Sequence, residues 1–178
     1  MTDRIVGMAC EGRQSSLLAC VQSLACRLLQ DSTMATQTET DIKQLNSFLR
    51  GELSAVETYT QCIKKLEDTG SRVQLDPLRA SHAMRVNLLT ARVASLGGEP
   101  EATSGAWGSL AKLAEGSAAV FGASAAIAML EEGEDHGKAI YLKDIEDLSA
   151  SNRQFVNAEI LPEQLRTHNL LAAIKTAG

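Results

Sequence analysis

The feature that most constrains the fold is an apolar pattern with helical spacing, which recurs in several long segments. In residues 41–67 the apolar positions are Leu45, Phe48, Leu49, Ala55, Val56, Tyr59, Ile63 and Leu66. Such spacing places side chains on one face of an α-helix. We predict similar helices over residues 77–96, 123–148 and 153–175, and a short helix over residues 106–118. Aromatic residues make up only 3% of the chain, which favours helices over sheets.

Local signals predict where these helices begin, break and bend. Thr40 and Asp76 are predicted N-caps, and a break is expected near Gly122. Pro162 lies inside the last predicted helix. Because proline lacks an amide proton and crowds the preceding turn, we expect a kink or a restart there.

The lengths of the links predict the topology. Short links join the first long helix to the second and the third to the fourth, so each pair is expected to be antiparallel. The link between the second and third helices is about 25 residues long with its short helix, enough to run the length of a bundle. The predicted fold is therefore all-α: a ferritin-like antiparallel four-helix bundle with one long crossover that contains a short helix.

The first 33 residues differ from the rest of the chain. The sequence before Cys20 resembles a lipoprotein cleavage motif, but Asp3 and Glu11 lie where a signal peptide is basic. We interpret residues 1–33 as an N-terminal extension, either disordered or a short helix, and residues 34–178 as the bundle. A cytoplasmic protein is expected; export is the alternative if the first segment is a signal.

Charge and composition narrow the partners. The formal net charge of −5 argues against a nucleic-acid surface, and no apolar run is long enough to span a bilayer. Small side chains dominate residues 106–128, which predicts close helix packing or, alternatively, the flat surface of a homo-oligomer. No nucleophile–base arrangement is evident, so the sequence does not decide whether the protein is an enzyme.

Polar side chains interrupt each apolar stripe near the middle of its helix. A buried carboxylate without a partner is costly, and several acids that face one core repel each other. A divalent cation, iron or manganese, would satisfy the oxygens and cancel the charge. The alternative is a metal-free network in which Arg85 and His82 neutralise Glu52 and Glu134. The candidate metal ligands are Glu52, His82, Glu134, Glu163 and His168.

Four stretches together resemble a bacterial ferritin-like family of four-helix-bundle proteins that is catalogued mainly as a domain of unknown function. They are LNSFLRGELSAVETY, SHAMRVNLLTARVASLGGEP, LEEGEDHGKAIYLKDIEDL and ILPEQLRTHNLL. The resemblance implies a dimetal carboxylate site and reactions such as iron oxidation and storage, or oxygen-dependent oxidation under stress. It assigns Glu52, His82 and Glu134 as ligands, with Glu163 or His168 contributed by the last helix. The wider group carries Glu-x-x-His on two helices, and this chain contains no such motif.

Two functional hypotheses follow. The first is a ferritin-like protein that binds iron or manganese and handles iron or oxidants. The second is a non-catalytic bundle with a metal-free ionic core, which acts in self-association or in binding a partner protein. They differ in whether the inward acids and the imidazole hold a cation.

Overall fold

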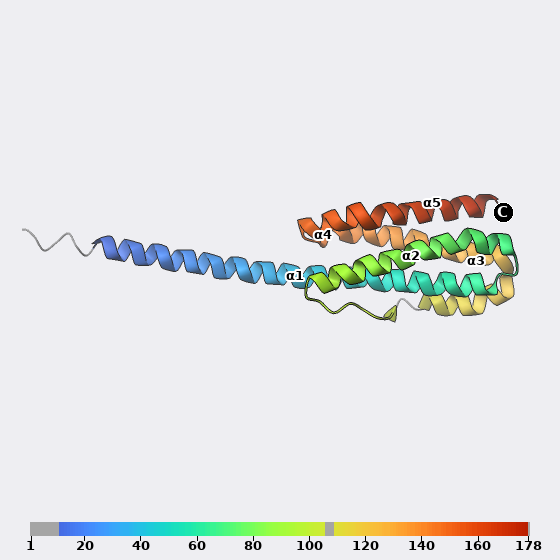
Figure 1. Ribbon diagram of the computed structural model, residues 1–178, viewed down its shortest axis with the longest axis horizontal. Coiled ribbons are helices and arrows are strands. Elements are labelled where there is room, and N and C mark those ends of the chain that lie inside the picture. Colours follow the sequence, from blue (N-terminus) through green and yellow to red (C-terminus); the bar gives the residue numbers. More distant parts are fainter. Residues whose placement is uncertain (1–10, 106–108, 178) are drawn as a thin grey trace, which may run out of the picture. The chain divides into compact units, whose positions relative to one another are not determined.

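The computed structural model describes the backbone of residues 11–105 and 109–177, and the side chains of residues 27, 30–105 and 123–176. No strand occurs among these residues, which confirms the all-α class. Figure 1 shows the long helices. The elements are α1 (Glu11–Lys65), α2 (Thr69–Ser95), α3 (Ser109–Asp144), the 3₁₀ helix η2 (Ile145–Asp147), α4 (Ala150–Phe155), the π-helix η3 (Val156–Ile160) and α5 (Leu161–Ala177).

The chain divides into two units, Met1–Thr38 and Glu39–Gly178. The helix α1 passes through the division, so the predicted N-cap at Thr40 is wrong. No glycine or proline occurs from residue 13 to residue 50, and nothing stops the helix. Instead of capping, the hydroxyls of Thr36 and Thr38 donate to backbone carbonyls one turn earlier. The predicted domain boundary after residue 33 stays a prediction.

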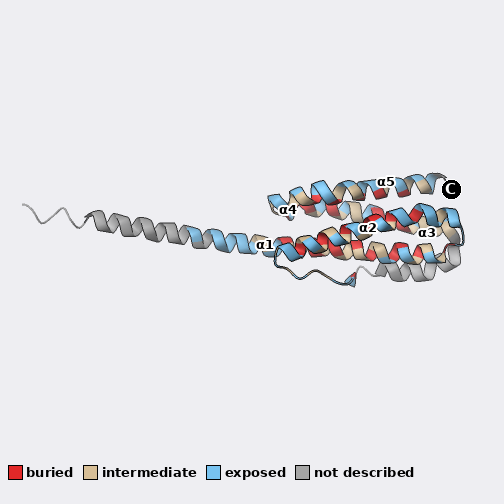
Figure 2. Ribbon diagram, viewed as in Figure 1, coloured by how far each residue is buried: buried red, intermediate tan, exposed pale blue. Residues whose placement is uncertain are grey.

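The unit Glu39–Gly178 is built on two apolar clusters, and Figure 2 shows buried residues along its helices. The first contains Leu45, Phe48, Leu49, Leu89, Val93, Tyr141, Ile145, Leu148, Val156 and Ile160. The second contains Tyr59, Cys62, Leu66, Leu75, Leu78, Ala126, Leu130 and Leu171. Residue numbers rise from the first cluster to the second along α1 and along the α4–α5 segment, and fall along α2 and α3. The first and last helices therefore run parallel to each other and antiparallel to α2 and α3.

The segment of residues 96–105, which follows α2, runs alongside α1. The side-chain amide of Asn46 exchanges two hydrogen bonds of 2.9 Å with the backbone of this segment. Further along α1, Arg50 pairs with one of its carboxylates at 2.8 Å, and Glu57 accepts a hydrogen bond from one of its hydroxyls at 2.8 Å. From Asn46 to Glu57 the segment follows the helix for about 16 Å.

Helix α2 begins two turns earlier than the sequence predicted. Its N-cap is Asp68, not Asp76: the Asp68 carboxylate accepts hydrogen bonds from the amides of Gly70 at 3.1 Å and Ser71 at 2.6 Å. Pro77 therefore lies inside the helix rather than in its first turn. The early cap satisfies the free amides of the first turn, which outweighs the loss of one hydrogen bond at the proline.

Of the predictions made at Gly122 and Pro162, the first is wrong and the second is confirmed. The short helix and the third long helix form the single element α3, so the break expected near Gly122 is absent; a single glycine among helix-forming alanines costs only about 1 kcal/mol. The side chains of residues 106–122 lie outside the described residues. As predicted, regular α-helix is interrupted at Pro162: the π-helix η3 precedes it, and the amide of Leu161 donates to the carbonyl of Val156.

Candidate functional site

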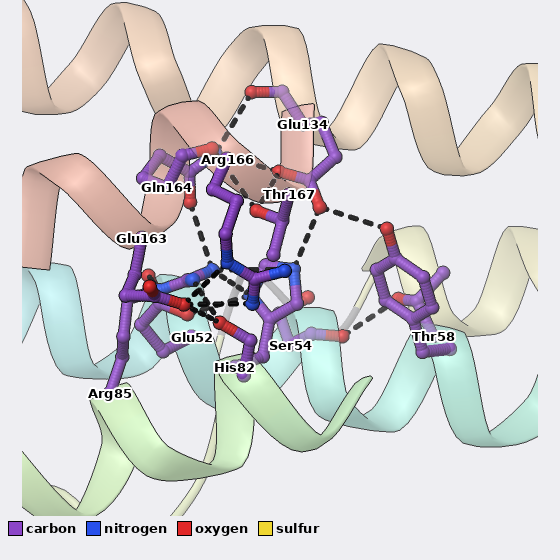
Figure 3. Close-up of polar contacts among 12 residues, drawn as sticks. Glu52, Ser54, Thr58, His82, Arg85, Glu134, Glu163, Gln164, Arg166 and Thr167 are labelled. Atoms are coloured by element: carbon purple, nitrogen blue, oxygen red, sulfur yellow. Dashed lines mark hydrogen bonds and ion pairs between the residues drawn. The ribbon is translucent and has the colours of Figure 1, made fainter. Parts of the chain in front are cut away.

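A polar layer lies between the two apolar clusters of the unit Glu39–Gly178. The helices α1, α2, α3 and α5 contribute side chains to it, and these side chains are buried. Figure 3 shows their polar contacts. The largest is Arg85, whose exposed fraction is 0%. The layer, which we call the ionic core, consists of Glu52 from α1, His82 and Arg85 from α2, Glu134 from α3, and Gln164 and Thr167 from α5.

His82 joins the two carboxylates of the ionic core. Its Nδ1 lies 2.7 Å from Oε2 of Glu52, and its Nε2 lies 2.9 Å from Oε1 of Glu134. The three candidate ligands that sequence reasoning placed on separate helices therefore do converge. The imidazole stands between the two acids, with both ring nitrogens engaged.

Arg85 approaches the same group from the next turn of α2. Its Nε donates to Oε1 of Glu52 at 2.9 Å, and its two Nη atoms donate to Oγ of Ser81 at 3.1 Å and to Oε1 of Gln164 at 3.0 Å. One Nη also lies 2.6 Å from Nδ1 of His82. Two cationic groups this close are tolerable only because carboxylates flank them.

Two tyrosine hydroxyls donate further hydrogen bonds to the carboxylates, each to the carboxylate of the other helix. The hydroxyl of Tyr141 donates to Oε1 of Glu52 at 2.8 Å, and that of Tyr59 donates to Oε1 of Glu134 at 2.8 Å. Each tyrosine lies seven residues after the acid of its own helix and bonds to the acid of the other helix, because α1 and α3 are antiparallel. On α5, Gln164 and Thr167 donate to Oε2 of Glu134 at 2.8 and 3.0 Å.

The pKa shifts in the ionic core all favour the charged forms of its groups. Burial would raise the pKa of Glu52, but Arg85 and His82 outweigh it and lower it from 4.5 to about 2. The pKa of Glu134 is lowered too, since burial is outweighed by His82 and Tyr59. Burial would lower the pKa of His82, but Glu52 and Glu134 raise it above 6.5. With His82 protonated between the two carboxylates, two negative and two positive charges balance inside the bundle.

A cavity of about 70 Å³ lies between α1 and α3 and touches the ionic core. Glu52, His82 and Glu134 line it, and Arg85 does not. Gly51 and Gly133 border it from the two helices, and a Cβ atom added at either would meet nothing within 4 Å. The cavity is large enough for several water-sized molecules.

The donor set does not fit a bound divalent metal in this arrangement. Three of the four carboxylate oxygens of Glu52 and Glu134 accept two hydrogen bonds each, and the fourth is engaged by His82. Both nitrogens of His82 are also taken, and Arg85 already supplies a cation. Within the described part of the chain, no group of three or more His, Cys, Asp or Glu side chains is arranged to hold a metal ion.

The two candidates from the last helix lie outside the ionic core. Glu163 is at its rim: the side chain is 31% exposed, accepts a hydrogen bond from Ser81 and pairs with Arg166. His168 faces another way and pairs with Asp135 at 2.7 Å, on the surface of the bundle. The helix α5 contributes amide and hydroxyl groups to the core instead of an acid or an imidazole.

Sequence reasoning missed the hydroxyl of Tyr59, which it counted among the apolar positions, and that of Tyr141. A signal was present: both α1 and α3 carry a Glu followed seven residues later by a Tyr. Seven residues are two helical turns, so each pair shares a face. Two such pairs on antiparallel helices predict crossed Tyr–Glu hydrogen bonds.

The fold and the ionic core define the class: an all-α helical bundle with a buried, charge-balanced polar layer. Residues 40–147, more than half of the chain, match the family described as "Domain of unknown function (DUF2383)", and the chain belongs to this family. This confirms the expected membership of a family catalogued as a domain of unknown function. No curated protein and no solved structure matches the chain. No helix in the described residues has the length and apolarity to cross a bilayer.

Proposed function

We propose that this protein is a ferritin-like bundle whose ionic core works without a metal, and that it acts by self-association rather than by dimetal chemistry. The ferritin-like part rests on the direction of the helices. The helices α2 and α3 run parallel to each other. The segment of residues 96–105, which follows α2 and precedes α3 in the sequence, runs alongside α1. One long crossover between the second and third helices is the connectivity of ferritin-like folds.

The metal-free part rests on one observation: groups of the chain itself engage every carboxylate oxygen and imidazole nitrogen of the ionic core. A divalent cation entering this neutral group would have to displace Arg85 or leave excess positive charge buried. Either change is unfavourable in a low-dielectric interior. Iron or manganese binding is the competing hypothesis.

The self-association part rests on an unpartnered apolar stripe on α2. Val73, Pro77, Ala80 and Met84 follow at intervals of four, three and four residues, so they share one helix face, and all are exposed. The exposed fractions of Val73 and Met84 are 66% and 42%. Helices that pair side by side use this spacing, and a second copy of the same stripe is a complementary occupant.

Two measurements test the proposal. The full chain, expressed in medium supplemented with iron and manganese, is expected to contain no stoichiometric metal by elemental analysis. Fe(II) loading without oxygen, followed by air, should give no new absorbance. Stoichiometric metal, or an oxygen-dependent band, would refute the metal-free core.

For self-association, light scattering after size exclusion should give a mass above that of the 19.0 kDa chain. Met84→Glu should lower it to the monomer. Leu142→Glu is the matched control, because Leu142 is 54% exposed on α3, away from the stripe. A monomeric wild type, or equal effects of the two variants, contradicts the assignment.

A further inference from the structure

The ionic core has the positions of a dimetal carboxylate site but different residues at them. In ferritin-like dimetal bundles, two helices supply one Glu each, and the other two each supply a Glu-x-x-His pair. Here α1 supplies Glu52 and α3 supplies Glu134, and both carboxylates are buried at mid-height. These two positions therefore carry the same residue, Glu, as in a dimetal site.

The other two helices carry i,i+3 pairs that point into the same layer. On α2 the pair is His82 and Arg85, and on α5 it is Gln164 and Thr167. Residues three apart share a helix face, which is the geometry that a Glu-x-x-His pair uses. The two pairs meet each other, since Arg85 donates to Gln164 at 3.0 Å, and both pairs bond to Glu134.

Charge supports the same correspondence. A set of four Glu and two His carries four negative charges, which two divalent cations balance. In this chain neither i,i+3 pair contains a carboxylate, and the carboxylates of Glu52 and Glu134 are balanced by His82 and Arg85. The guanidinium of Arg85 contacts a carboxylate, a hydroxyl and an amide oxygen, which are acceptors that hard cations also use.

We propose that the ionic core is a dimetal ligand set in which Arg85 and protonated His82 have replaced the two metal ions. This inference rests on the metal-free core proposed above. It explains why the chain lacks Glu-x-x-His and yet buries polar residues at all six positions. It also predicts that substitutions at the two i,i+3 pairs alone create a metal centre, with the cavity beside Glu52 and Glu134 leaving room for water on the ions.

The test is to restore the motif. In the variant His82→Glu/Arg85→His/Gln164→Glu/Thr167→His, we expect two Co²⁺ per chain by dialysis and elemental analysis, with visible absorption bands of protein-bound Co²⁺. Because four buried carboxylates repel one another, this variant is expected to stay unfolded without metal and to fold when Co²⁺ is added. The matched control adds Glu52→Gln and Glu134→Gln, and should bind no more than one Co²⁺.

A smaller change keeps the test independent of that variant's folding. Arg85→His alone leaves two carboxylates and two imidazoles, and should bind one Co²⁺ per chain. The inference is overturned if circular dichroism shows both variants to be folded and neither binds more Co²⁺ than the wild type. It is also overturned if the fourfold variant stays unfolded with Co²⁺ and Arg85→His binds none. Metal in the wild type would instead refute the metal-free core, so the two failures are distinguishable.

Discussion

The substitution Glu52→Gln measures how much the charge of one buried carboxylate contributes to the fold. The side chain is 3% exposed and lies within hydrogen-bonding distance of Arg85, His82 and Tyr141. Glutamine has nearly the same shape, so packing is preserved while the charge is lost. Two cations then face only Glu134.

The magnitude follows from the pKa of Glu52. Arg85 and His82 outweigh burial and lower this pKa from 4.5 to about 2. At about 1.4 kcal/mol for each pKa unit, the charged form stabilises the folded state by about 3 kcal/mol. Breaking a buried ion pair by removing one partner typically costs about 3–5 kcal/mol, which agrees. We therefore expect Glu52→Gln to lower the free energy of unfolding by about 3–5 kcal/mol at neutral pH.

Urea unfolding followed by circular dichroism measures this loss, and the midpoint should fall by more than about 1 M. The direction of the pKa shift also predicts how this loss depends on pH. Because the folded pKa of Glu52 is lowered, its contribution is complete above pH 4.5 and disappears as the pH falls towards 2. The difference between wild type and variant should therefore shrink over that interval.

The matched control is Glu163→Gln, at the rim of the same cluster. This carboxylate is 31% exposed and pairs with the exposed Arg166, so we expect a loss of less than about 1 kcal/mol. If Glu52→Gln cost no more than this control, or if the cost did not change below pH 4.5, the account of the ionic core would be refuted.

Three further outcomes are expected. The raised pKa of His82 means that its contribution to stability is complete below pH 6.5 and is lost as the pH rises through the folded value. His82→Gln should therefore flatten the dependence of stability on pH above 6.5, and an unchanged slope would contradict this. Tyr141→Phe removes a donor to Glu52 and should cost about 2 kcal/mol in urea unfolding, against no loss if the hydroxyl is unimportant. Gly98→Ala would place a Cβ 2.6 Å from a methyl group of α1 and should cost about 1–3 kcal/mol, whereas Gly51→Ala, with open space around it, should not lower the melting temperature.

Helix ends were the least predictable part of the fold. Asp76 before Pro77 is a strong start signal, but Asp68 caps the helix two turns earlier because its carboxylate reaches two free amides. Several residues of one helix can satisfy the same local rule, so the sequence does not rank them. Pro162 was predictable in effect, since a missing amide proton disturbs any helix that contains it.

The sequence by itself determined that Glu52, His82, Arg85 and Glu134 would face the interior. Periodicity fixes which face of a helix a residue occupies, and burial forces polar groups on that face to find partners. Which partners they find was decided only by the tertiary structure.

The partners depend on the heights at which antiparallel helices align, and periodicity carries no information about that alignment. The alignment sets Tyr59 opposite Glu134 and Tyr141 opposite Glu52, places Gln164 against Arg85, and turns His168 towards the surface. A pattern of inward acids is compatible with a metal or with a cation from the chain. Packing brings the chain's own cations, Arg85 and His82, within hydrogen-bonding distance of the carboxylates, which is the observation behind the proposed metal-free core.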